Sequence, residues 1–237
     1  MQRSSLLGAS VGLALLTGCE SNNYDYVASP AIPVVVASPA VTIVGSGVTA
    51  TEARPAPGFT AVAVSAPFRV VLAPGAPSLE VTADDNVVPL VRSEVHGDTL
   101  VLGFTLSSVS LTRTREILVR ATVPELREAR GSGAAVLELS GFETDRLLVD
   151  LSGASAGSAV GTVGELTLLL SGASRWSGPA LRARSVRATL SGASFAIQRV
   201  ADSLRADLSG ASTLEYLGDP AVVSDVSGAS VIRRIGP

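Results

Sequence analysis

Leu151-Ser152-Gly153-Ala154-Ser155 is the most informative segment of the chain, because its Ser-Gly-Ala core occurs six times. Each copy opens with a serine followed by a glycine: Ser132-Gly133, Ser152-Gly153, Ser171-Gly172, Ser191-Gly192, Ser209-Gly210 and Ser227-Gly228. The steps between successive copies are 20, 19, 20, 18 and 18 residues. Self-similarity at such a period is the signature of a repeat architecture.

Each copy follows an alternation of apolar or small residues, the pattern of a strand with one buried face. Leu147, Val149 and Leu151 precede the second copy, and Leu166, Leu168 and Leu170 precede the third. A unit of this length is shorter than a strand-helix-strand crossover of about 30 residues. It matches one coil made of two or three short strands, with equivalent strands stacked about 4.8 Å apart. The sequence therefore predicts an all-β fold, a parallel β-helix of about 18–20 residues per coil.

The Ser-Gly-Ala-Ser string is typical of a sharp corner between stacked strands. Glycine permits a bend that a Cβ would obstruct, so large residues at Gly172 or Gly192 should clash with both neighbouring levels. We expect the alanine to lie where the coils crowd the interior. We expect the last serines to form an outward polar ladder that could meet an extended ligand: Ser155, Ser174, Ser194, Ser212 and Ser230.

The repeat coils occupy residues 124–237 and are preceded by an opening β region at 59–123. Period-two alternation predicts strands around Phe68–Leu72 and Leu79–Ala83, with further strands at Leu100–Phe104 and Ile117–Val123. Turn residues separate these strands. They are Ala73-Pro74-Gly75, Asp84-Asp85-Asn86 and His96-Gly97-Asp98.

The N-terminus carries the features of an export signal. Residues 1–18 contain Arg3, the apolar run Leu6–Leu16 and Gly18, directly before the only cysteine, Cys19. Leu16-Thr17-Gly18-Cys19 resembles the lipobox of bacterial lipoproteins, which implies cleavage before Cys19 and its lipidation. Residues 19–58 contain several prolines and predict an extended tether, although valine runs such as Val41–Val44 could pair as short strands.

A family resemblance follows from the opening strands, from Pro124-Glu125-Leu126 leading into Gly131-Ser132-Gly133-Ala134, and from the serial Leu-Ser-Gly-Ala-Ser copies. Together they resemble the "putative auto-transporter adhesin head GIN domain" family over residues 59–237. The resemblance implies a β-helical fold on exported, often lipid-anchored, bacterial proteins, and an adhesin function.

The composition excludes several classes of protein. The formal net charge is −3, and all 18 basic residues are scattered arginines, so nucleic-acid binding is not expected. With Cys19 lipidated, no thiol remains for a disulfide or a zinc site. His96 is the only histidine, and its turn setting favours a solvated side chain over a catalytic base. We therefore expect no catalytic residue, no metal and no cofactor.

Outward carboxylates leave one enzymatic alternative. Asp150, Asp207 and Asp225 occupy equivalent positions in their coils, so Asp207 and Asp225 could be neighbours. Parallel β-helices also host polysaccharide lyases and hydrolases with carboxylate sites. A concave groove with at least three convergent charged side chains would favour that alternative.

The favoured prediction is a non-catalytic envelope protein, an adhesin or binding module. An acyl anchor on Cys19 would hold it in a membrane, with the outer membrane expected. Its ligand would be a glycan or a protein surface, and periplasmic and surface-facing orientations both stay open.

Overall fold

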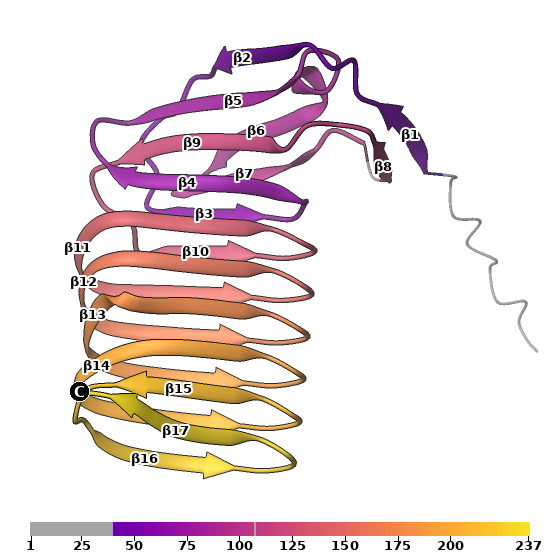
Figure 1. Ribbon diagram of the computed structural model, residues 1–237. Helices are drawn as coiled ribbons and strands as arrows, with labels where there is room; N and C mark the ends of the chain where they lie inside the picture. Colours follow the sequence, from indigo (N-terminus) through magenta and orange to yellow (C-terminus); the bar gives the residue numbers. More distant parts are fainter. Residues whose placement is uncertain (1–39, 107) are drawn as a thin grey trace, which may run out of the picture. The chain divides into compact units, whose positions relative to one another are not determined.

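A computed structural model describes residues 40–106 and 108–237, and within them the protein is built of strands (Figure 1). The single helical element in this part is the short 3-10 helix η1 (Val88–Leu90). No described helix has the length and apolar character that a membrane span requires. The predicted all-β fold and the parallel β-helix are confirmed.

The strands fall into an opening set and a coil set. The opening set comprises β1 (Val41–Val44), β2 (Thr49–Ala53), β3 (Ala61–Val64), β4 (Phe68–Pro74), β5 (Ser78–Asp84), β6 (Val91–His96), β7 (Thr99–Phe104), β8 (Val109–Thr112) and β9 (Ile117–Val123). The coil set comprises β10 (Glu128–Gly131), β11 (Val136–Leu151), β12 (Ala156–Leu170), β13 (Arg175–Leu190), β14 (Phe195–Leu208), β15 (Thr213–Leu217), β16 (Ala221–Val226) and β17 (Val231–Gly236).

Each central coil is one long strand that bends in its middle, rather than the two or three separate strands expected from the sequence. Strands β11 to β14 pair in parallel, each with the next, through both halves of the coil. Register shifts mark the bends, as between Ser140 and Phe142 on β11. A coil therefore has one Ser-Gly-Ala-Ser turn at one edge and one bend at the other.

The core is a column of small and branched side chains between the two halves of the coils. Leu168, Ala188 and Ala206 lie at equivalent positions of successive coils, and all are fully buried. In β16 the corresponding face is open: Val222 and Val226 are 39% and 40% exposed. No described strand pairs with the outer edge of β16, so its inner side chains lie at an open end of the stack. The predicted burial of β16 is therefore not seen.

The opening strands continue the β-helix instead of forming a separate layer. Strand β3 pairs in parallel with β10 and β7, and β4 pairs in parallel with β11 and β9. Antiparallel pairs then close this end, with β5 on β9, β2 on β5 and β6 on β7. The stacking extends beyond the Ser-Gly-Ala-Ser copies because Ser65-Ala66-Pro67 turns the chain without that motif.

The folded part begins inside the predicted tether. Strand β1 pairs with β8, and β2 pairs with β5 throughout its length. The prolines of the tether lie at Pro30, Pro33, Pro39, Pro55 and Pro57, which leaves residues 40–54 free of proline and able to donate to a strand ladder. The signal segment 1–18, Cys19 and the first half of the tether lie outside the described residues.

Candidate functional site

The Ser-Gly-Ala-Ser turns form a stacked structural edge. Their glycines all have positive φ, from 69° at Gly228 to 78° at Gly210. From the second copy onward, the alanine after the glycine donates its amide to the glycine carbonyl of the preceding coil, as from Ala193 to Gly172 at 2.8 Å. A Cβ on Gly192 would lie 2.5 Å from that carbonyl oxygen of Gly172. The corner prediction is confirmed, although the nearest atoms belong to the preceding level alone.

The predicted outward serine ladder is wrong. Ser155, Ser174 and Ser194 are each 1% exposed, and Ser212 is fully buried. Each of these four hydroxyls donates to the carbonyl of the serine that opens its own turn, at 2.6 to 2.8 Å. Ser230 in the last coil is half-buried and accepts from the Ser212 amide at 3.2 Å. Burial therefore leaves no hydroxyl unpaired. The alanine of each turn, expected in the interior, is the exposed residue.

The turn residues considered for chemistry have structural partners. His96 ends β6 of the β6–β7 hairpin, is 67% exposed in its side chain, and lies 2.9 Å from Glu94. Asn86 donates from its side-chain amide to Val44 O and accepts from the Ser46 amide. Asp84 is buried and accepts from the Arg115 amide. The Asn86 contacts hold the β1–β2 segment against the opening strands.

Asp207 on β14 and Asp225 on β16 lie at paired positions of adjacent strands, as their places in the repeat suggest. Arg205 Nε lies 3.9 Å from Asp207. Across the described ranges, no group of three or more His, Cys, Asp or Glu side chains could hold a metal ion. Like other outward charged residues of the coils, Asp207 has a neighbouring side chain of opposite charge.

A hollow lies elsewhere, at the bends of β11 to β14, and the sequence did not predict it. We call it the bend groove. It has a volume of about 690 Å³, and its charged lining residues are Glu125, Glu143, Asp145, Arg182, Arg184 and Asp202. A second hollow of about 620 Å³ shares Glu125, Asp145, Gly164 and Arg184 with it, so the depression extends along the bends.

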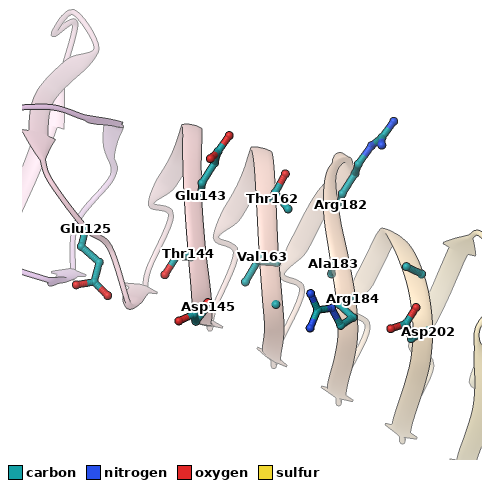
Figure 2. A pocket seen from close by; sticks show the side chains of 12 residues that line it. Glu125, Glu143, Thr144, Asp145, Thr162, Val163, Arg182, Ala183, Arg184 and Asp202 are labelled. Atoms are coloured by element: carbon teal, nitrogen blue, oxygen red, sulfur yellow. The ribbon is translucent and has the colours of Figure 1, made fainter.

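A glycine deepens the bend groove. Gly164 on β12 lies between Asp145 and Arg184 of the adjacent coils, and a Cβ there would come within 2.6 Å of Asp145 O. Figure 2 shows the Arg184 side chain extending from β13 toward the β12 bend, with Asp202 reaching toward β13 from the other side. Successive coils therefore place charged side chains around a level that has none.

Two arginines of the bend groove are free of ion pairs. In residues 40–106 and 108–237, no carboxylate lies within 4.0 Å of Arg182 or Arg184. Beside the groove, Arg146 and Glu165 are 3.1 Å apart. The unpaired guanidinium groups remain available to a ligand.

Glu125 has a partner at the edge of the groove. Arg127 donates to it at 2.8 and 3.1 Å. This hydrogen bond from Arg127 holds the pKa of Glu125 below its ordinary value of 4.5, and Glu125 in turn raises the pKa of Arg127. Glu125 is thus a paired, ionised carboxylate at neutral pH.

Comparisons with known proteins agree with the coil architecture. Residues 58–220 match the family described as "Putative auto-transporter adhesin, head GIN domain". The chain belongs to this family. The GIN-domain match covers the opening strands and most of the coils, and it ends just before β16. No functionally curated protein matches the sequence.

Solved structures share the GIN-domain fold at low sequence identity. A "putative adhesin" from Bacteroides fragilis superposes with a TM-score of 0.64 at 20% identity, covering 81% of this chain and 100% of that one. A "putative adhesin" from Parabacteroides merdae gives 0.50 at 18%, covering 82% and 99%. A "Putative lipid binding protein" from Parabacteroides distasonis gives 0.53 at 16%, covering 82% and 100%. These likenesses establish the fold alone.

Proposed function

We propose that this GIN-domain protein is a non-catalytic, lipid-anchored binding module of the bacterial cell envelope, acting as an adhesin. Membership of the family supports the adhesin class. The bend groove supports binding, because it is open to solvent and presents unpaired charges from several coils.

The anchoring part of the proposal rests on Cys19 and the segment before it. Leu6–Leu16 is about as long as the apolar core of an export signal and too short to span a bilayer comfortably. Acyl chains on Cys19 would each bury methylenes worth about 0.8 kcal/mol apiece, and several chains would give stable attachment. Residues between Cys19 and β1 would then separate the binding domain from the membrane, with the outer membrane as the proposed location.

The observation that carries the binding proposal is the set of unpaired charges on adjacent coils. Asp145, Arg184 and Asp202 come from β11, β13 and β14 and are exposed. Asp145 and Arg184 flank the side-chain-free level of Gly164, and Asp202 lies one coil beyond Arg184. Such a surface contacts a ligand through many weak interactions, and dense display on a membrane would strengthen them by multivalency.

Adhesion of coated beads tests this proposal. Beads carrying the full chain should adhere to a surface coated with envelope polysaccharide. The combined variant Asp145→Asn, Arg184→Gln and Asp202→Asn should reduce the adhering fraction severalfold. A matched control, Asp207→Asn and Asp225→Asn with Arg120→Gln, makes the same three charge changes outside the groove and should adhere like the parent. Equal adhesion of parent and groove variant would remove the groove from the proposal.

A glycan-cleaving enzyme is the second candidate, because Asp145, Arg184 and Asp202 line one groove. Carboxylates supply general acids and bases in glycoside cleavage. Release of new reducing ends from a soluble polysaccharide distinguishes the two functions. Their release by the parent but not by Asp145→Asn would establish catalysis and contradict the non-catalytic proposal.

A further inference from the structure

The charges of the bend groove follow an order along the stack of coils. The register places Glu143, Thr162 and Arg182 at equivalent positions of β11, β12 and β13. Asp145, Gly164 and Arg184 follow the same order beside them. Among these residues the β11 bend is acidic, the β12 bend uncharged and the β13 bend basic, and Asp202 of β14 follows one coil beyond the arginines. Two coil spacings separate the acidic from the basic bend, which is about 10 Å.

A ligand that satisfies both ends must carry charges of both signs. A purely anionic chain would pair with Arg182 and Arg184 but would meet repulsion at Glu143 and Asp145. A purely cationic chain would pair with Glu143 and Asp145 but would be repelled by the two arginines. In the described residues, none of these four side chains has an ion-pair partner of its own. Their charges are therefore unneutralised within the protein.

The direction of the groove favours a glycan over a peptide. A ligand that contacts successive bends runs across the strands. Along β12, both flanking strands already occupy the backbone hydrogen-bonding groups. A peptide lying there could not add to the sheet as a further strand, which is the usual source of affinity for an extended peptide. A sugar residue in an extended β-1,4-linked chain advances by about the spacing of one coil, so one sugar can lie over each coil.

We propose that the bend groove binds a zwitterionic glycan with one sugar per coil. An amino sugar lies against Glu143 and Asp145, a neutral sugar crosses Gly164, and an acidic sugar lies against Arg182 and Arg184. This inference rests on the proposed binding function and adds the chemical class of the ligand.

Three synthetic trisaccharides test the assignment. The zwitterionic probe is glucosamine, N-acetylglucosamine and glucuronic acid in β-1,4 linkage, made in both orders. Its N-acetylated form has only the carboxylate, and its carboxyl-reduced form has only the ammonium group. Calorimetric titration of the full chain in lipid nanodiscs should show one order of the zwitterion binding about threefold to fivefold more tightly than either singly charged form.

Single substitutions assign each charge to its place. Asp145→Asn should remove the preference for glucosamine over N-acetylglucosamine and keep the preference for the carboxylate. Arg184→Gln should remove the preference for the carboxylate and keep the preference for glucosamine. Each variant should bind the zwitterionic probe about threefold to fivefold more weakly than the parent. Asp225→Asn and Arg120→Gln make the same charge changes outside the groove and should leave both preferences intact.

The outcomes separate this inference from the function on which it rests. Equal binding of the zwitterionic and anionic forms, or binding of none of the three, overturns the zwitterionic assignment. If the bead assay still depends on the groove residues, the groove stays a binding site and only the ligand class is wrong. If the groove variant adheres like the parent, the binding proposal itself fails.

Discussion

Trp176 on β13 donates a 2.9 Å hydrogen bond from Nε1 to Oε1 of Gln198 on β14, and both side chains are fully buried. The Gln198 amide group donates in turn to the carbonyls of Leu181 and Arg199, at 2.8 and 2.9 Å. The largest side chain of the coil interior is thus joined to the next coil by a hydrogen-bonded polar group.

We predict that Gln198→Leu lowers the free energy of unfolding by about 1–3 kcal/mol, because it leaves the buried indole N–H without an acceptor. Trp176→Phe combined with Gln198→Leu should cost less than the two single costs added together, since the unpaired donor is then absent. Urea denaturation of the four proteins measures this coupling. Strict additivity would show that the hydrogen bond contributes nothing.

We predict that Gly192→Val destabilises the protein by roughly 2–5 kcal/mol, because the residue has a φ of 74° and its Cβ would meet Gly172 O. Gly97→Val is the matched control, with a φ of 65° and open space around the position. Its cost should be smaller, since it contains the backbone strain without the clash. Thermal unfolding compares the two, and equal losses would mean that stacking does not constrain the corner.

We predict that Ser194→Ala costs about 0.5–1.5 kcal/mol, the value of one internal hydrogen bond, and leaves bead adhesion unchanged. The hydroxyl donates to Ser191 O inside the turn, and the equivalent residue of the first copy is already the buried Ala135. If Ser194→Ala weakened adhesion without changing stability, the serines would have a role in binding after all.

We predict that Cys19→Ser releases the protein from the membrane fraction, because the thiol is the proposed site of acylation. The measurement is immunoblotting of membrane and soluble fractions of the producing bacterium. Ser21→Ala, two residues further on, serves as a control and should stay in the membrane. A membrane-bound Cys19→Ser protein with its signal uncleaved would indicate that the segment is itself the anchor.

Much of the fold could be predicted because it depends on local periodicity. The alternation at Leu166, Leu168 and Leu170 defines a buried face without knowledge of any partner strand, and all three are buried. The opening strands at Leu100 and Ile117 were also found by alternation. Their membership of the same stack was not found, because their turns lack the repeated motif.

The side-chain positions in the turns were harder to predict. The hydroxyl of Ser155 suggested an outward residue, yet the carbonyl of Ser152 satisfies it inside the turn. Polarity is thus a poor guide to exposure where a local acceptor exists. The first copy has an alanine, Ala135, at the same place, and this was the signal available in the sequence. In the structure Ala135 is buried.

The coil, its period and its corner could be predicted from the sequence alone, since strand alternation and a glycine turn depend on residues close together in the chain. The bend groove could not be predicted in this way. Asp145, Gly164, Arg184 and Asp202 are far apart in sequence and share no motif, and the varying steps between copies obscure their alignment. Register between coils brings them together, because backbone hydrogen bonds fix which residue of one coil lies beside which residue of the next.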